Sequence, residues 1–273
     1  MDAGLQAAVA GRYTVEREIA RGGMATVVLA RRLNDGAPVA IKLLRPEFAR
    51  VVGAERFHRE TALLRTLDHP NILPLLETGQ AGALPFYVMP FADGGSLRDR
   101  LTRTPHLPVD EVRSIVAAVT AALDYAHAHN IVHRDIKPDN VLFRGDRTVV
   151  SDFGIARAIV RAGGERLSSS GLTPGTPQYM SPEQVNRVED LDGRSDIYSL
   201  GCMVYEMLAG EPPFRGATVQ AILARHVGDP PPGLRVVRPE LPESLAAAVR
   251  TALAKRPADR PATGAEFLTA MSR

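Results

Sequence analysis

Apolar and polar positions alternate along the first part of the chain. Residues 13–19 alternate between the two classes, which predicts a strand. Apolar runs begin again at residues 27–30 and fill residues 39–44, with Asn34-Asp35-Gly36 between them. Turn-forming residues between two apolar runs favour a hairpin. We therefore expect three antiparallel strands at the start of the chain.

The later apolar positions predict two more strands and then a series of helices. The strands are expected at residues 72–76 and 86–89, with a glycine-containing turn between them. The helices are expected at residues 53–66, 112–126 and 196–208, along the face of Leu245, Val249 and Leu253, and after a capping box at residues 263–266. The pattern as a whole favours a small sheet followed by a mostly helical part.

Two polar segments flank a predicted hairpin in the middle of the chain. The first reads His133-Arg134-Asp135-Ile136-Lys137-Pro138-Asp139-Asn140, and the second is Asp152-Phe153-Gly154. Two short apolar runs joined by a polar turn lie between them, which predicts a pair of strands. Because a hairpin brings its two ends together, we expect Asp135, Asn140 and Asp152 to converge.

This combination of side chains points to phosphate chemistry. Mg²⁺ prefers oxygen ligands and usually takes only one or two carboxylates from a protein, and Asn140 and Asp152 fit that set. Asp135 would then orient or deprotonate a nucleophile, and Lys137 would offer a positive charge to a phosphate. The alternative is that these residues simply form a polar turn. The two interpretations differ in whether the rest of the chain contains the other parts of a phosphate site.

The two segments resemble the catalytic loop and the magnesium-binding segment of protein kinases. The loop between the first two strands stands where that family has G-x-G-x-x-G-x-V. It retains Gly22 and Val27, but Ala20 and Ala25 replace the outer glycines. Small residues let backbone N–H groups approach a phosphate, although an ordinary hairpin turn has a similar composition. The Gly22-Gly23-Met24 form is similar to that of bacterial serine/threonine kinases of the eukaryotic type.

The resemblance implies an ATP site. Lys42 would hold the α- and β-phosphates and pair with Glu60 on the following helix, whereas without the resemblance Lys42 could equally extend into solvent. Residues 90–97 resemble the hinge between two lobes, in which Pro90 still offers its C=O to adenine although it lacks an N–H. The residues implied to contact ATP are Ile19, Gly22, Gly23, Val27, Ala40, Lys42, Met89, Pro90, Ala92 and Leu142.

The polar stretch at residues 162–173 resembles an activation segment. Its implied phosphorylation sites are Ser168 and Ser170, followed by Thr173 and Ser169. Arg134 and Arg157 match the family positions that collect such a phosphate, which adds about −1.5 to −2 charges at pH 7. The alternative is a flexible loop without a regulatory role.

Residues 175–183 resemble the family's substrate-binding segment. Thr176 would form hydrogen bonds near Asp135 and Lys137 and shape the site for an acceptor hydroxyl. Glu183 would be buried and would need a cation, for which Arg260 matches the family's partner. Asp196 matches the family aspartate that holds the backbone of the catalytic loop.

Composition adds little to this interpretation. The chain has 273 residues and a formal net charge of +2, which is ordinary for a soluble domain and gives no support for nucleic-acid or membrane partners. Its one cysteine, Cys202, lies in an apolar run and is expected to be a buried thiol, which fits a reducing compartment. No run approaches the roughly 20 apolar residues of a membrane span, and residues 1–10 lack the features of a secretion signal. We expect a cytoplasmic location, either alone or as the cytoplasmic domain of a longer, membrane-anchored protein.

The resemblance extends over residues 11–273 and implies an α+β, bilobal protein-kinase-like fold. A small antiparallel β-sheet with one main helix would form the N-lobe, and a larger, mostly α-helical C-lobe would follow, with ATP in the cleft. The implied divisions are an N-terminal extension at 1–10 and a catalytic domain at 11–273, made of an N-lobe (11–90), a hinge (90–93) and a C-lobe (94–273).

The implied activity is transfer of the ATP γ-phosphate to serine or threonine hydroxyls of proteins, with Mg²⁺, or Mn²⁺ in its place. Lys137 and Thr176 favour serine/threonine over tyrosine acceptors. The implied partners are protein substrates and a second copy of the chain, phosphorylated in trans through a transient homodimer. Two other classes stay open: a pseudokinase, which would lack catalysis, and a small-molecule kinase, which would lack the segments at residues 181–183 and 196–201.

Overall fold

The computed structural model of the chain describes residues 3–156, 158–159 and 176–272. These residues divide into two compact units. The first contains the described residues of Met1–Asp68, Leu73–Asp93 and Gly154–Pro174. The second contains the described residues of His69–Ile72, Gly94–Phe153 and Gly175–Arg273.

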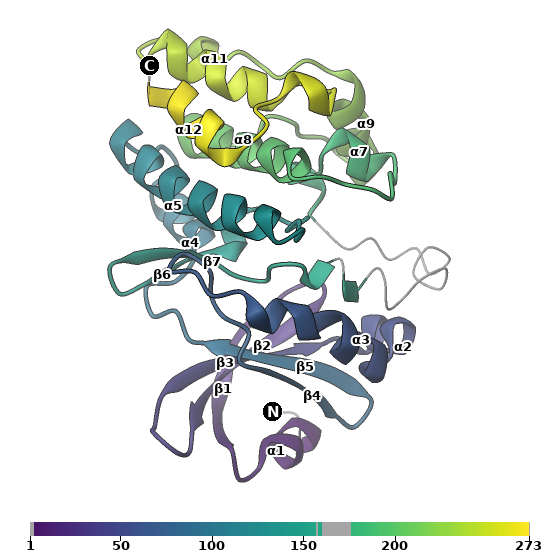
Figure 1. Cartoon of the computed structure of the whole chain (residues 1–273). Helices are drawn as coiled ribbons and strands as arrows, with labels where there is room; N and C mark the ends of the chain where they lie inside the picture. The colour runs from purple at the N-terminus through teal and green to yellow at the C-terminus, as the bar shows by residue number, and fades with distance from the viewer. Residues whose placement is uncertain (1–2, 157, 160–175, 273) are drawn as a thin grey trace. The chain divides into compact units, whose positions relative to one another are not determined.

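The first unit is built on a five-stranded antiparallel sheet with the order β1-β2-β3-β5-β4 (Figure 1). Its strands are β1 (Tyr13–Arg21), β2 (Ala25–Arg32), β3 (Pro38–Leu44), β4 (Glu77–Ala81) and β5 (Leu84–Pro90). The three strands expected at the start of the chain are confirmed, and each extends slightly beyond its predicted range. The strand expected at residues 86–89 is also confirmed as part of β5.

The two faces of this sheet differ in the side chains that they carry. On β3, the odd-numbered residues Val39, Ile41 and Leu43 belong to a buried apolar cluster. Side chains alternate between the faces of a strand, so Ala40 and Lys42 face the other way. The sheet therefore has one face with a buried apolar cluster and one face that carries a lysine.

A helix that the sequence did not lead us to expect covers the apolar face. Helix α1 (Ala3–Val9) contributes Leu5 and Val9 to the buried cluster, beside Val28 and Val88 of the sheet. In Figure 1 it lies on the side of the sheet opposite α3 (Ala54–Thr61). Residues of the expected N-terminal extension are thus part of the core of this unit.

The single helix expected at residues 53–66 is wrong in its detail. The chain forms α2 (Pro46–Val52), then α3, then the 3₁₀ turn η1 (Ala62–Thr66). Gly53 separates the first two with a φ of 68°, a conformation that glycine adopts at little cost. Phe57 of α3 contacts the ring of Tyr87, which pairs with Lys42, so α3 packs on the lysine-bearing face.

The strand expected at residues 72–76 is also wrong, because the fourth strand is β4, five residues later. Pro74 has no N–H to give to a sheet, which disfavours a strand there. The glycine in the β4 sequence is typical of a turn, but the strand requires a glycine at position 79 for packing. A Cβ at this position would lie 2.4 Å from the ring of Phe86 on the neighbouring strand.

The second unit is mostly helical, as expected (Figure 1). Its helices are α4 (Leu97–Arg103), α5 (Val109–Ala128), α7 (Pro182–Val185), α8 (Arg194–Ala209), α9 (Val219–Gly228), α10 (Leu234–Val237), α11 (Glu243–Ala252) and α12 (Gly264–Ser272), with 3₁₀ turns η2 (Pro138–Asn140), η3 (Pro177–Tyr179) and η4 (Pro257–Asp259). Helix α8 is buried along nearly its whole length and includes the buried thiol of Cys202. Helices α5 and α11 pack against α8, and α12 packs against α5 and α11.

The capping box expected at residues 263–266 is half formed. Thr263 accepts a hydrogen bond from the N–H of Glu266 at 3.1 Å, but the Glu266 carboxylate accepts from Ala262 at 2.8 Å instead of from Thr263. The carboxylate of Asp124 on α5 accepts the next two N–H groups, of Gly264 and Ala265. A tertiary contact therefore completes the helix start that the local sequence only half specifies.

The hairpin expected in the middle of the chain is confirmed as β6 (Val141–Arg144) and β7 (Arg147–Val150). A two-residue turn joins them, and Gly145 supplies its positive φ of 58°. The segments that carry the candidate chemistry lie directly before β6 and directly after β7. Among the helices described, none has the length and apolar character needed to cross a membrane.

Candidate active site

The segment at residues 133–140 is held in place by one buried carboxylate. Asp196, at the start of α8, accepts hydrogen bonds from the backbone N–H groups of His133 and Arg134, each at 2.8 Å. His127 at the end of α5 donates to the same carboxylate at 2.8 Å. Burial alone would raise the pKa of Asp196, but the hydrogen bond and charge of His127 and its other donors hold that pKa below its usual range.

Asp196 also holds a costly backbone conformation. Arg134 has a φ of 69°, in the left-handed region that non-glycine residues rarely occupy. Two successive N–H groups converge on Asp196 because the chain turns at this point. The cost of the turn is therefore offset by hydrogen bonds to a buried charge.

His133 joins the two candidate segments. Its Nδ1 accepts from the N–H of Asp135 at 3.2 Å, so Nε2 carries the proton and donates to the carbonyl of Ser151 at 2.9 Å. Its ring packs edge-on against Phe153, with 4.6 Å between the ring centroids. The imidazole thus positions the backbone on both sides of the hairpin.

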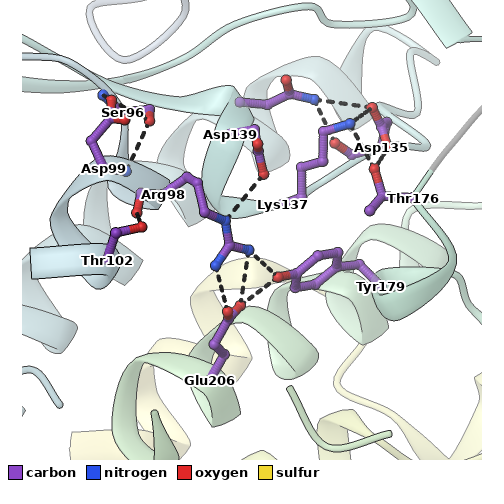
Figure 2. Close-up of polar contacts among 11 residues, drawn as sticks. Ser96, Arg98, Asp99, Thr102, Asp135, Lys137, Asp139, Thr176, Tyr179 and Glu206 are labelled. Atoms are coloured by element: carbon purple, nitrogen blue, oxygen red, sulfur yellow. Dashed lines mark hydrogen bonds and ion pairs between the residues drawn. The ribbon is translucent and has the colours of Figure 1, made fainter. Parts of the chain in front are cut away.

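Asp135, Lys137 and Thr176 form a compact polar cluster (Figure 2). The Nζ atom of Lys137 lies 2.8 Å from Oδ2 of Asp135 and donates to the Thr176 hydroxyl at 2.7 Å. The same hydroxyl donates to Oδ1 of Asp135 at 3.4 Å. A carboxylate, an ammonium group and a hydroxyl therefore meet at one point.

Asn140 fits the role of a cation ligand beside this cluster. Its amide nitrogen donates to the backbone carbonyl of Asp135 at 2.8 Å and to Oδ2 of Asp135 at 3.2 Å. The amide oxygen, which is the atom that could bind a cation, therefore points in another direction. The carbonyl of Asn140 accepts from the N–H of Ser151 at 2.8 Å, which places Asp152 one residue away.

Asp152 has a φ of 64°, another left-handed non-glycine residue. Together Asn140 and Asp152 offer an amide oxygen and a carboxylate, which is the small, hard-oxygen set that Mg²⁺ takes when phosphates and water supply the rest. The described residues contain no group of three or more His, Cys, Asp and Glu side chains arranged for a metal.

In the first unit, strand register gathers four of the residues expected to contact a nucleotide. Val27 pairs with Lys42, and Ala40 pairs with Met89. Paired residues of antiparallel strands point to the same face, so all four lie on the face that α3 also covers. Glu60 is on α3 and, like Lys42, is half-buried. The sheet therefore presents an ammonium group next to a strip of apolar side chains.

The glycines of the first loop do not serve an unusual backbone conformation. Neither Gly22 nor Gly23 has a positive φ, and a Cβ on Gly23 would meet no atom within 4 Å. The N–H of Gly22 donates to the carbonyl of Ala25 at 2.9 Å and closes the turn. The open space beside these residues, and not their flexibility, is what a phosphate could use.

The other expected nucleotide contacts are less distinctive. Ile19 lies at a register shift between β1 and β2. Pro90 ends β5, where it pairs with Val39, and Ala92 follows it two residues later. Leu142 pairs with Val149 in the β6–β7 hairpin of the second unit. Arg157 and the expected phosphorylation sites Ser168, Ser169, Ser170 and Thr173 lie outside the described residues.

Glu183 and Arg260 form a two-pronged ion pair in the second unit. The two guanidinium Nη atoms lie 2.6 and 2.8 Å from the two carboxylate oxygens. Arg260 also donates to the carbonyls of Ala254, Arg194 and Lys255. Burial would raise the pKa of Glu183, but the hydrogen bond and charge of Arg260 lower it overall. This pair joins α7 to the start of α8 and to the end of the chain.

Several residues that organise the site were not singled out in the sequence. His127 stands at the end of α5, where a polar residue is ordinary, and it donates to Asp196. A Cβ on Gly193 would lie 2.4 Å from its Nδ1, so a small residue at 193 makes room for it. Arg98, Tyr179 and Glu206 form a further polar group near Asp139. Because these residues are far apart along the chain, no local pattern predicts the group. Its sequence signals are an arginine, Arg98, between two leucines and a glutamate, Glu206, within an apolar helix.

Comparisons with known proteins agree with this geometry. A profile described as the protein kinase domain matches residues 13–268. Serine/threonine-protein kinase PknB of Mycolicibacterium smegmatis is 42% identical over 263 residues, which cover 94% of this chain and 42% of that protein. The probable serine/threonine-protein kinase PknB of Bifidobacterium longum is 39% identical over 272 residues, which cover 95% of this chain and 39% of that protein.

A solved structure shares the fold. The crystal structure of Rad53 1–466 in complex with AMP-PNP matches with a TM-score of 0.80 at 25% identity, and the match covers 98% of this chain and 67% of that one. By contrast, the chain spans less than half the length of the two curated relatives.

Proposed function

The chain belongs to the protein kinase family and has its fold, and from this premise we propose that it transfers the γ-phosphate of ATP to serine and threonine hydroxyls of proteins. The observation that carries the proposal is the cluster in which Asp135, Lys137 and Thr176 meet. It combines a proton acceptor, a cation and a hydroxyl that orients both. Phosphoryl transfer depends mainly on such positioning and charge compensation.

Each side chain of the cluster has a distinct role in this proposal. Asp135 orients the acceptor hydroxyl and takes its proton. Lys137 carries a positive charge beside Asp135, where it stabilises negative charge that develops on the transferred phosphoryl group. Thr176 holds both groups through its hydroxyl. Asn140 and Asp152 would hold Mg²⁺, or Mn²⁺ in its place, and the metal when bound would compensate charge on the ATP phosphates.

By the family resemblance, residues of the first unit, together with Leu142, would bind the rest of ATP. Lys42, paired with Glu60, would hold the α- and β-phosphates, and the backbone at Gly22 and Gly23 would approach the phosphates closely. The adenine ring would lie against apolar side chains, with hydrogen bonds to the backbone of Pro90 and Ala92. The proposed adenine contacts are Ile19, Val27, Ala40, Met89, Pro90, Ala92 and Leu142.

The choice of serine and threonine over tyrosine rests on Lys137 and Thr176 and on the names of the relatives. Regulation would act through phosphorylation of Ser168, Ser169, Ser170 or Thr173, in trans by a second copy, with Arg134 and Arg157 collecting the phosphate. Residues 11–273 would form the catalytic domain, in a cytoplasmic setting. Because the relatives are more than twice as long as the match, substrates and partners of a whole protein belong to this proposal as well.

Transfer to peptides that differ only in the acceptor tests the proposal. The chain is incubated with Mg-ATP and with peptides of identical neutral sequence that contain serine, threonine or tyrosine, and with glycerol as a small alcohol. We expect phosphate on the serine and threonine peptides only. Transfer to glycerol alone would indicate a small-molecule kinase, and tight ATP binding without any transfer would indicate a pseudokinase.

A further inference from the structure

Arg98 of α4 lies at the centre of a polar cluster close to the proposed acceptor site (Figure 2). Its Nη1 lies 2.6 Å from Oε1 of Glu206, and its Nη2 lies 3.4 Å from Oε2. Nη2 also donates to the hydroxyl of Tyr179, which in turn donates to Oε2 of Glu206. The Nε atom of Arg98 lies 3.5 Å from Oδ2 of Asp139. One guanidinium group therefore serves two carboxylates and a phenol.

Burial makes this arrangement necessary for Glu206. The Glu206 side chain is only 5% exposed, so its carboxylate would be costly to leave without a cation. The Asp139 side chain is 51% exposed and the Arg98 side chain is 35% exposed. The cluster therefore has a buried anionic end and an end that solvent, or a bound peptide, can reach.

The charges within the cluster reinforce one another. Burial alone would lower the pKa of Arg98, but the hydrogen bond and charge of Glu206, with contributions from Tyr179 and Asp139, raise it. Burial and the negative charge of Glu206 raise the pKa of Tyr179, so its hydroxyl keeps its proton. Two carboxylates face one guanidinium, so without Arg98 the cluster would carry two uncompensated negative charges.

The cluster adjoins both segments that would surround the acceptor. Asp139 lies in η2, two residues after Lys137, and Tyr179 lies in η3, three residues after Thr176. Lys137 and Thr176 are themselves hydrogen-bonded. A peptide whose hydroxyl reaches Asp135 would place a neighbouring side chain near the exposed end of this cluster.

Helix α4 fixes Arg98 before any substrate arrives. Ser96 and Asp99 form a complete capping box at its start, and Leu97 and Leu101 are buried on its inner face. The hydroxyl of Thr102 donates to the carbonyl of Arg98 at 2.9 Å. The Arg98 side chain therefore loses little conformational entropy when it binds the Glu206 carboxylate.

We propose that Arg98 is a specificity residue that fills, from within the chain, an anionic subsite beside the acceptor. It thereby removes any preference for basic residues next to the phosphorylated serine or threonine. A basic peptide side chain would have to displace a guanidinium that already serves three partners. A neutral side chain displaces nothing. This inference rests on the proposed kinase function.

The test measures kcat/KM for a set of peptides with one threonine acceptor, in which a single arginine is moved through each flanking position of a neutral sequence. For the wild-type chain, we expect no position to raise kcat/KM more than about twofold over the neutral peptide. In Arg98→Met, Glu206 and Asp139 lose their cation, and we expect arginine at one or two positions to raise kcat/KM about tenfold.

Two variants show whether the gain belongs to this cluster. Arg98→Met combined with Glu206→Gln should lose most of the gain, because the buried charge that attracts the peptide arginine is gone. Arg103→Met removes an exposed arginine from the same helix, outside the Glu206 cluster, and should keep the wild-type profile. Should Arg98→Met fail to fold, Arg98→Lys replaces it. Its single ammonium group cannot serve all three partners, so about a threefold gain is expected.

The possible outcomes distinguish failure of this inference from failure of the proposed kinase function. A wild-type chain that already prefers arginine peptides, or an Arg98 variant that folds and gains no preference, would overturn the inference while leaving the kinase function in place. A wild-type chain that binds Mg-ATP and phosphorylates no peptide would overturn the proposed function, and the inference with it.

Discussion

Lys137 donates a 2.7 Å hydrogen bond to the hydroxyl of Thr176, which lies 39 residues further along the chain. The bond ties the segment that contains Asp135 to the segment that begins η3. Thr176 contributes a hydroxyl that accepts from Lys137 and donates to Asp135 at the same time. The Thr176 hydroxyl therefore links Lys137 and Asp135 to the second segment of the proposed active site.

Replacing Thr176 tests this dependence. Thr176→Val keeps the shape of the side chain but removes the hydroxyl, so Lys137 and Asp135 lose their shared partner. We expect kcat for peptide phosphorylation to fall about tenfold to a hundredfold, because a small misplacement of reacting groups can cost that much. Thr176→Ser keeps the hydroxyl and should stay within about threefold of the wild type. Equal activity of the two variants would contradict the role given to this hydroxyl.

Lys42 should matter for phosphate positioning and little for the fold. Its side chain is half-buried and lies on the face of β3 opposite the apolar cluster of Ile41 and Leu43. We expect Lys42→Met to lower kcat/KM for ATP about a hundredfold, since a charge that positions phosphate is lost. Its thermal unfolding temperature without nucleotide should change by only a few degrees. An active Lys42→Met chain would remove this residue from the mechanism.

His127 should make stability depend on pH. Burial alone would lower its pKa, but the hydrogen bond and charge of Asp196, with Asp124 and Asp192 nearby, raise it. A raised pKa in the folded state contributes stability that is fully present below the unfolded value of about 6.5. That contribution is lost as pH rises through the folded pKa.

Urea unfolding of the wild type and His127→Gln checks this sign. The difference in unfolding free energy between the two chains should be larger at pH 6 than at pH 9. Because glutamine does not titrate, the difference between the two pH profiles of unfolding free energy reports the titration of His127. A difference that grows toward pH 9 would contradict the assignment of the charge pair.

The pair formed by Glu183 and Arg260 should be structural. The Arg260 side chain is buried, and it also satisfies three backbone carbonyls. We expect Arg260→Met to lower the free energy of unfolding by about 3–5 kcal/mol, because Glu183 is left as an uncompensated buried charge. Adding Glu183→Gln should restore part of that loss. A loss below about 1 kcal/mol, the size of an exposed pair, would show that the pair contributes little.

The parts of the site that could be predicted from the sequence are those in which neighbours in sequence are also neighbours in space. Asp135, Lys137 and Asn140 lie within six residues, and a single hairpin brings Asp152 toward them. The apolar alternation that predicts β1 to β3 is local in the same way. Such features need no knowledge of tertiary contacts.

Other features depend on contacts that no local pattern reveals. Arg98 and Glu206 are 108 residues apart and meet only because α4 and α8 belong to one folded unit. The sequence of strand β4 is typical of a turn, and its glycine, Gly79, leaves room for the ring of Phe86 on the neighbouring strand. Helix α1 is only seven residues long, too short to be stable alone, and it packs Leu5 and Val9 on the apolar cluster of the sheet. Tertiary burial, which outweighs local propensity, decides these cases.

The central claim is that Asp135 serves a phosphoryl transfer carried out by this chain. Intact mass and peptide mapping of the purified chain after incubation with Mg-ATP, beside Asp135→Asn, test it most directly. We predict added phosphate on serine or threonine residues of the wild type, among Ser168, Ser169, Ser170 and Thr173, and none on a variant that folds equally well. Equal phosphate on both chains would contradict the role of Asp135, and phosphate on neither would contradict self-phosphorylation by this chain.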